Sequence, residues 1–225
     1  MTVSGSSGMR FRRLYNKEGG LGTNRLEALS DGVFGVAITL LILAIAVPEL
    51  SKTDLADGQL LHMVIALWPK VLVYVMSFLI VGIFWVGHAI MFAYIHRSDR
   101  TLLYLNTLLL MTVSFIPFAA DLLGRYPREP VALAVYGLTL AFGGVMFEVV
   151  WIYASKKHRL IRANMPHDLI HLGKIVILIT PVIYTLAAVL AFWNSYLSLG
   201  IYVLVPLLYM IPGPIDDLVT AARGE

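Results

Sequence analysis

The chain contains no cysteine among its 225 residues. A disulfide framework, a thiolate metal site and a cysteine nucleophile are therefore excluded. Charged side chains are also scarce, because they make up 14% of the sequence, whereas an ordinary soluble domain has about 25%. The sequence lacks a nucleotide-binding loop, an HExxH metal motif and a nucleophile elbow, so nothing in it favours an enzyme or a bound cofactor. Its net charge of +3 gives no indication of nucleic-acid binding.

Hydrophobic residues dominate the chain instead. They make up 59% of the sequence, and the mean hydropathy is +0.80. Six long stretches hold most of them, at about 25–47, 62–95, 101–121, 131–154, 171–193 and 196–211. About 20 helical residues cross a hydrocarbon core of about 30 Å, and no stretch alternates with period two like a barrel strand. The sequence therefore predicts an all-α polytopic membrane protein with six transmembrane helices.

Prolines mark the ends of these helices and points inside them. Pro48 follows the first stretch directly, whereas Pro69, Pro117 and Pro181 lie inside later stretches. Membrane helices tolerate proline where neighbouring groups satisfy the carbonyl that loses its partner. We therefore expect kinks rather than breaks at these three positions.

Lysine and arginine predict the orientation, because they are enriched in cytoplasmic loops. Eleven lie on the side of the two termini: Arg10, Arg12, Arg13, Lys17, Arg97, Arg100, Lys156, Lys157, Arg159, Arg162 and Arg223. Only Lys52, Arg125 and Arg128 lie on the opposite side. We therefore expect a multi-pass protein of the plasma (inner) membrane with both termini in the cytoplasm. The predicted parts are a basic amino-terminal segment (1–24), a membrane domain (25–212) and a short tail (213–225).

The first stretch, RLEALSDGVFGVAITLLILAIAV, carries polar residues near its start. Arg25, Ser30 and Asp31 all lie in its first two turns. Ionisable groups at membrane depth are costly and usually face the protein interior. Two interpretations remain open. Either these side chains fix the helix to its neighbours through buried hydrogen bonds, or Asp31 takes part in proton or ion transfer.

A second face of the same helix is almost entirely apolar. Val36, Thr39 and Leu43 follow the spacing i, i+3 and i+7, and Leu40 borders them. Val36, the first residue of this stripe, points about 140° away from Asp31. In a symmetric oligomer it would line a narrow pore, with apolar rings as a hydrophobic gate and threonine hydroxyls for a dehydrating cation. A lipid-facing or helix-packing surface is the alternative, since any apolar helix has such a stripe.

The segment RLEALSDGVFGVAITLLILAI resembles the first-helix motif of the transmembrane protein 175 potassium channels, RxxxFSD followed by a GVFAIAITLL-like run. FWVGHAIMFAYI and DRTLLYLNTLLLMTVSFIPF, in the second and third stretches, are similar to the bacterial members. The resemblance is close over residues 25–121 and rests on helix count and length beyond them. It implies a homotetramer of six-helix subunits in which helix 1 lines the pore and potassium ions pass passively. The TVGYG filter of other potassium channels is absent from this sequence.

The resemblance also implies roles for individual residues. It puts a narrow apolar ring on Val36, the selectivity layer on Thr39 and a further apolar ring on Leu43, with no metal other than permeating potassium. The residues that match the motif, or face it from helices 2 and 3, are Arg25, Leu29, Ser30, Asp31, Trp85, His88 and Asn106. In the family they hold helix 1 in place. Leu29 replaces the motif's Phe, so we expect an aromatic packing contact to be missing. Gly35 and Val36 stand where Ala and Ile are usual, so we expect a wider or more mobile constriction.

A proton-coupled secondary transporter is the alternative function. It would use Asp31, Glu148 and His88 as titratable groups. Transporters of this kind often show weak symmetry between two halves and paired broken helices. Neither feature is evident in this sequence, which favours the channel.

Overall fold

The structure is a computed structural model, and it describes residues 22–46, 59–162 and 165–211. The predicted amino-terminal segment, the loop after the first helix and the tail lie largely outside these residues. The elements are α2 (Asn24–Leu40), η1 (Leu41–Ala44), α4 (Gln59–Ala66), α5 (Trp68–Tyr94), α6 (Arg100–Arg125), α7 (Pro130–Ser155), η2 (Lys156–His158), α8 (His167–Leu190) and α9 (Ser195–Tyr209). In the described part, extended pairing is limited to one isolated bridge between Ile95 and Ile161. The all-α prediction is therefore confirmed.

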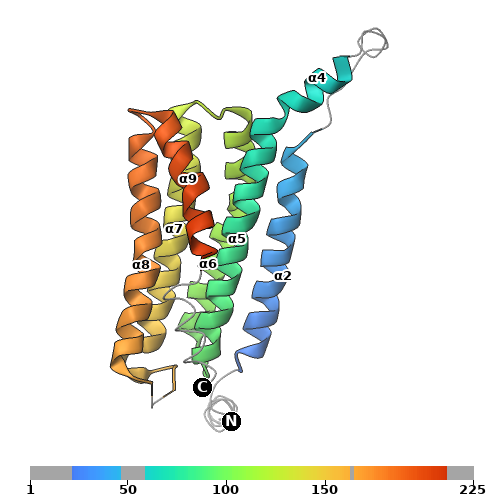
Figure 1. Ribbon diagram of the computed structural model, residues 1–225. Coiled ribbons are helices and arrows are strands. Elements are labelled where there is room, and N and C mark those ends of the chain that lie inside the picture. Colours follow the sequence, from blue (N-terminus) through green and yellow to red (C-terminus); the bar gives the residue numbers. More distant parts are fainter. Residues whose placement is uncertain (1–21, 47–58, 163–164, 212–225) are drawn as a thin grey trace, which may run out of the picture.

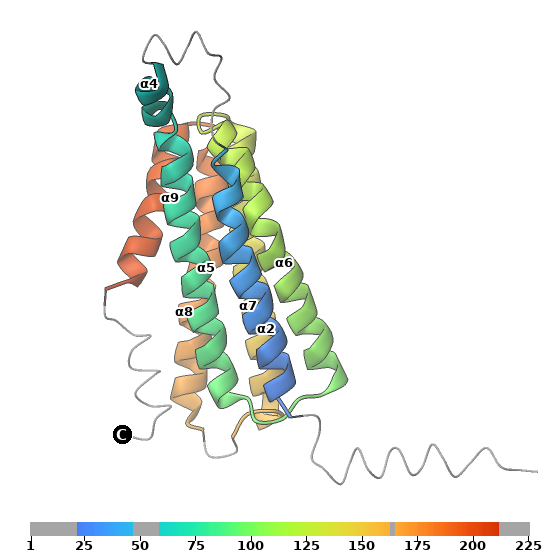
Figure 2. The same cartoon turned by 90° about the vertical axis from the view of Figure 1, so that its right-hand side faces the viewer.

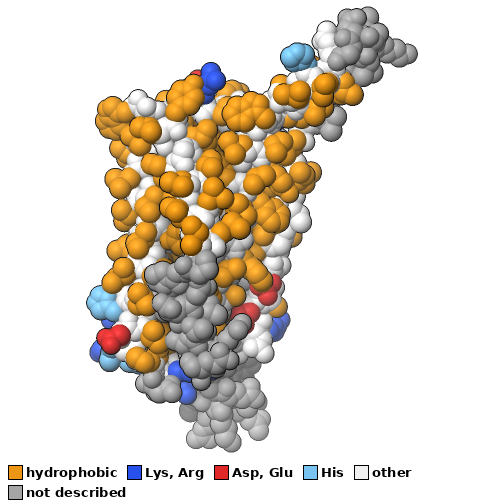
Figure 3. Space-filling view, in the orientation of Figure 1, with side chains coloured by type: hydrophobic (Ala, Val, Ile, Leu, Met, Phe, Trp, Pro, Cys, Tyr) orange, Lys and Arg blue, Asp and Glu red, His pale blue; other side chains and the backbone are white. Residues whose placement is uncertain are grey.

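The long helices form one antiparallel bundle (Figures 1 and 2). α7 packs against α6 and α8 and is the most buried of the spans, whereas α2 packs against α5 and α6 at the edge of the bundle. Hydrophobic side chains cover its sides, while charged side chains gather near the two ends (Figure 3). This distribution is the one that a lipid environment requires, because charge is costly in the hydrocarbon core.

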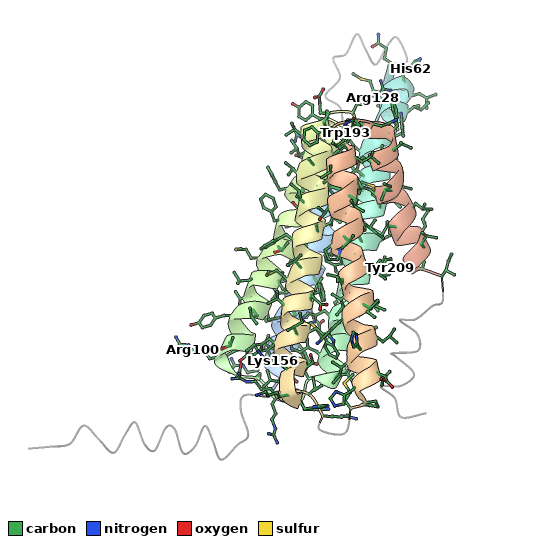
Figure 4. All side chains as sticks on the ribbon, turned by 90° about the vertical axis from the view of Figure 1, so that its left-hand side faces the viewer. His62, Arg100, Arg128, Lys156, Trp193 and Tyr209 are labelled. Carbon is green, nitrogen blue, oxygen red and sulfur yellow. The ribbon has the colours of Figure 1, made fainter. Side chains whose placement is uncertain are left out.

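Among the described residues, five spans are long and apolar enough to cross a membrane, and the sixth predicted helix is shorter. α9 has 15 residues and therefore reaches about 22 Å. Its last residue, Tyr209, lies part-way along the bundle, far from the end that carries Lys156 (Figure 4). The predicted stretch ran to residue 211. The helix ends earlier because Pro212 follows, and a residue before proline disfavours helical backbone.

The prolines behave in two ways. Pro117, Pro181 and Pro206 lie inside continuous helices, as expected for the first two. Pro69 differs, because the second stretch is interrupted at Leu67 and this proline lies in the first turn of α5. A proline is well suited to that position, where its missing N–H needs no partner. α4 consequently projects from the bundle, and none of its residues is buried (Figure 1).

Glycines on α7 allow its neighbours to approach closely. A Cβ at Gly137 would lie 2.0 Å from the hydroxyl oxygen of Tyr202 on α9, and one at Gly144 would lie 2.8 Å from Pro181 on α8. The Tyr202 hydroxyl donates to the Leu133 carbonyl at 2.9 Å. The short α9 is thus attached to the centre of the bundle by a buried aromatic side chain.

Candidate functional site

The first helix has one buried face that attaches it to the bundle. Leu26, Ser30, Phe34, Ala37 and Leu41 follow helical spacing, and each is at most 5% exposed. Four of these side chains are apolar and pack against α5 and α6. Between membrane helices such contacts act through close van der Waals packing, because lipid tails are as apolar as the side chains. Ser30 is the polar exception, and its hydroxyl donates to the Leu26 carbonyl at 2.8 Å.

A chain of hydrogen bonds links this buried serine to two other helices. The Asn106 amide nitrogen, on α6, donates to the Ser30 hydroxyl at 3.0 Å. The Asn106 carbonyl oxygen lies 3.0 Å from Nε2 of His88 on α5. Since that oxygen can only accept, His88 is the donor. All three residues are at most 2% exposed, so α2, α5 and α6 are joined at a buried site.

Aromatic rings enclose the histidine of this network. The His88 ring stacks on Phe92 with centroids 4.3 Å apart and meets Phe34 of α2 at 5.6 Å. Phe34 and Phe92 were not singled out from the sequence, where they are two of ten phenylalanines. Their spacing gives a partial signal, because Phe34 lies four residues after Ser30 and Phe92 four residues after His88, on the same helix faces.

Asp31 occupies a different position from the one expected. It lies on the exposed side of the subunit, and its Oδ1 accepts a 2.8 Å hydrogen bond from the indole nitrogen of Trp85 on α5. Arg25 is exposed as well. The expectation that the polar set faces inward as a whole is therefore wrong for these two residues. The reason is geometric: Ser30 takes the inward position, and the next residue lies about 100° further round the helix.

The apolar stripe lies on the outward face of α2 and continues onto η1, which carries Leu43. Val36 is 57% exposed, Leu40 42% and Leu43 72%, and Thr39 is also exposed. Leu29 extends this uncovered surface towards the start of the helix. The described part of the subunit thus leaves a continuous strip of α2 without a packing partner.

Thr39 is the polar group of that strip. Its hydroxyl lies 2.9 Å from the Val36 carbonyl and 3.1 Å from the Gly35 carbonyl, both within α2. The single hydroxyl proton is therefore used towards the helix backbone. The oxygen lone pairs remain available on the outward side, where they can accept a hydrogen bond or coordinate a cation.

The three titratable residues of the transporter alternative are not brought together as one relay. Glu148 lies on α7 and interacts electrostatically with Lys174 of α8, whereas His88 interacts with Asp31. Within the described residues, one buried carboxylate oxygen of Glu148 has no hydrogen-bond partner. In the part of the chain that the structure describes, Glu148 forms no hydrogen bond or ion pair with His88 or Asp31.

The fold and this helix define a polytopic α-helical membrane protein whose first helix is attached by one face and uncovered on the other. The model of the family described as endosomal/lysosomal potassium channel TMEM175 matches residues 25–117. A potassium channel of Streptomyces collinus is 38% identical over 191 residues, which are 83% of this chain and 91% of that protein. A potassium channel of Chamaesiphon minutus is 36% identical over 183 residues, 80% of this chain and 89% of that one.

A solved structure agrees with these relatives. The crystal structure of a lysosomal potassium-selective channel TMEM175 homolog from Chamaesiphon minutus superposes with a TM-score of 0.74 at 32% identity, covering 84% of this chain and 96% of that one. The chain therefore belongs to the endosomal/lysosomal potassium channel TMEM175 family. Its fold is that of a TMEM175-type channel, and its family consists of channels rather than enzymes.

Proposed function

We propose that this protein is the subunit of a homotetrameric, potassium-selective channel in the plasma membrane, with both termini in the cytoplasm. The uncovered strip of α2 is the observation that carries the proposal, because a symmetric ring of subunits would bring four such strips around one axis. Its relatives in Streptomyces collinus and Chamaesiphon minutus are named potassium channels, which supports potassium as the permeant ion.

In this arrangement the branched apolar side chains act as a hydrophobic gate. Val36, Leu40 and Leu43 have 42–72% of their surface uncovered on the single subunit. Rings of such side chains repel water from a narrow pore and can close it by dewetting. Water would re-enter when the rings separate, so a small outward movement of α2 would be enough to open the channel.

Thr39 forms the selectivity layer. Its hydroxyl proton is occupied by the helix backbone, so four outward hydroxyl oxygens would meet a passing cation. Oxygen atoms that replace part of the hydration shell favour a weakly hydrated cation such as potassium. The layer takes the place of the backbone carbonyl filter of other potassium channels.

The hydrogen bonds behind α2 serve to position this lining. Ser30, Asn106 and His88 join three helices in the bundle interior, and Asp31 joins α2 to Trp85 at the surface. Together they prevent rotation of α2, which would turn Thr39 away from the axis. Arg25 and Leu29 lie near the amino-terminal end of the same helix.

Ion flux through purified full-length protein in liposomes tests the proposal. With a high potassium concentration inside and a low one outside, balanced by sodium, the reversal potential is expected near the potassium equilibrium value and independent of a pH gradient. The variant Thr39→Ala is expected to weaken the preference for potassium over sodium, because the oxygen layer is lost.

Thr107→Ala is the matched control for that variant. Thr107 is an exposed threonine on α6 whose hydroxyl also donates to its own helix backbone, at 2.8 Å. The variant Thr107→Ala should retain the potassium selectivity of the parent protein. Unchanged selectivity in Thr39→Ala would remove Thr39 from the filter, and flux that strictly follows a proton gradient would favour the transporter that uses Asp31, Glu148 and His88.

A further inference from the structure

Two connections at one end of the bundle form a single basic surface. They are residues 95–100, between α5 and α6, and residues 156–162, after α7. A backbone bridge pairs Ile95 with Ile161, and the His96 N–H donates to the Leu160 carbonyl at 3.0 Å. Ile95, Leu160 and Ile161 are at most 6% exposed, so the two connections share a small apolar centre and hold each other in place.

Positive charge on this surface greatly exceeds negative charge. The two segments carry six cations and one acid: Arg97, Arg100, Lys156, Lys157, Arg159, Arg162 and Asp99. All six cations are exposed. Arg100 and Lys156 lie near the same end of the bundle, opposite the end that carries Arg128 (Figure 4). The two segments therefore form a strongly positive surface in which Asp99 is the single acidic side chain.

That single acid is already engaged within the protein. Asp99 accepts hydrogen bonds from the Leu102 N–H at 2.9 Å and from the Tyr153 hydroxyl at 2.7 Å. It also forms a 3.0 Å ion pair with Arg159, whose guanidinium carbon lies 4.9 Å from the centre of the Tyr153 ring. This ion pair holds Arg159 in place. The other cations have no acidic partner within the two segments, so they are available to bind an anion from outside the protein.

The turn after α7 is also fixed. Lys157 and His158 adopt left-handed backbone, with φ of 56° and 51°, although neither is glycine. His158 Nε2 donates to the Met165 carbonyl at 3.1 Å. Such backbone persists where surrounding contacts maintain it. Lys156 and Lys157 are therefore presented on an ordered turn.

The position of the basic surface relative to the bilayer indicates which ligand it contacts. α6 and α7 have 26 residues each, so they are about 39 Å long, more than the hydrocarbon core of about 30 Å and less than the whole bilayer of about 40–45 Å. Their ends, where these cations begin, lie at the level of the lipid headgroups. We propose that this surface, defined by residues 95–100 and 156–162, binds the phosphate groups of anionic phospholipids in the adjoining leaflet.

Lipid retention by the full-length protein in neutral detergent tests this proposal. Phosphatidylglycerol and phosphatidylcholine with identical acyl chains are titrated separately, and bound lipids are counted by native mass spectrometry. We expect phosphatidylglycerol to bind at lower concentration, because each cation near the surface contributes about fivefold in affinity. Lys156→Gln with Lys157→Gln should weaken its binding by about 25-fold, whereas Lys156→Arg with Lys157→Arg should retain it.

The matched control removes two exposed arginines from the opposite end, Arg125→Gln with Arg128→Gln. It should leave phosphatidylglycerol binding within about twofold of the parent protein. Equal retention of the two lipids, or an equal loss in this control, would show that the surface has no preference for anionic lipid. Displacement of phosphatidylglycerol by millimolar inorganic phosphate would assign the site to a soluble anion instead and overturn the proposal.

Discussion

Asn106 is the position at which a single substitution removes the hydrogen bonds from α6 to both α2 and α5. Replacing it with leucine keeps a similar volume but removes the donor to Ser30 and the acceptor for His88. Ser30 keeps its bond to the Leu26 carbonyl, so it loses only a bond that it accepts. His88, at 2% exposure, is left with a buried donor and no partner.

The expected loss of stability follows from these two changes. Hydrogen bonds between membrane helices contribute about 0.6 kcal/mol each on average, and a buried donor without a partner costs about 1–3 kcal/mol. We therefore expect Asn106→Leu to lower the free energy of unfolding by about 2–4 kcal/mol. Thr107→Val, on the next residue and exposed, should change it by less than about 0.5 kcal/mol.

Removing both partners distinguishes a lost hydrogen bond from poor packing. His88 stacks on Phe92 and meets Phe34, so phenylalanine is a suitable replacement for its ring. The double variant His88→Phe with Asn106→Leu should recover at least about 1 kcal/mol relative to Asn106→Leu, because no buried donor remains. Unfolding by a denaturing detergent, followed by circular dichroism, compares the parent protein with these three variants. A double variant that is less stable than Asn106→Leu would refute the reasoning.

Two further predictions concern other parts of the bundle. Gly137→Ala should lower the free energy of unfolding by about 1–3 kcal/mol, because its Cβ would lie 2.0 Å from the Tyr202 hydroxyl oxygen; the same assay with Gly200→Ala, which meets nothing within 4 Å, should show no loss. Burial opposes ionisation of Asp99, but bonds from the Leu102 N–H and Tyr153, together with Arg159, outweigh it and lower the pKa of Asp99. The contribution of Asp99 to stability is therefore complete above its unfolded pKa of about 4 and is lost as the pH falls below that value. The unfolding temperature of Asp99→Asn should accordingly differ less between pH 3 and pH 7 than that of the parent protein.

Much of the membrane architecture could be predicted from the sequence, because hydrophobic length is a local property. A stretch of about 20 apolar residues has few stable alternatives to a helix in a bilayer. The start of α6 also follows a local rule. Asp99 precedes α6 and caps its first turn, as an aspartate before an apolar run would suggest. Its two side-chain partners, Tyr153 and Arg159, are more than 50 residues away in the sequence, so no local pattern indicates them.

The tertiary structure decided how each helix is rotated and where it stops. By itself, the sequence determined that α2 crosses the membrane with a polar start and an apolar stripe. Whether Ser30 or Asp31 faces inward depends on Asn106 and Trp85, which belong to other helices. The interruption at Leu67 and the early end of α9 likewise depend on the balance between proline and packing. Periodicity determines which residues share a face, whereas only the neighbouring helices determine which face is covered.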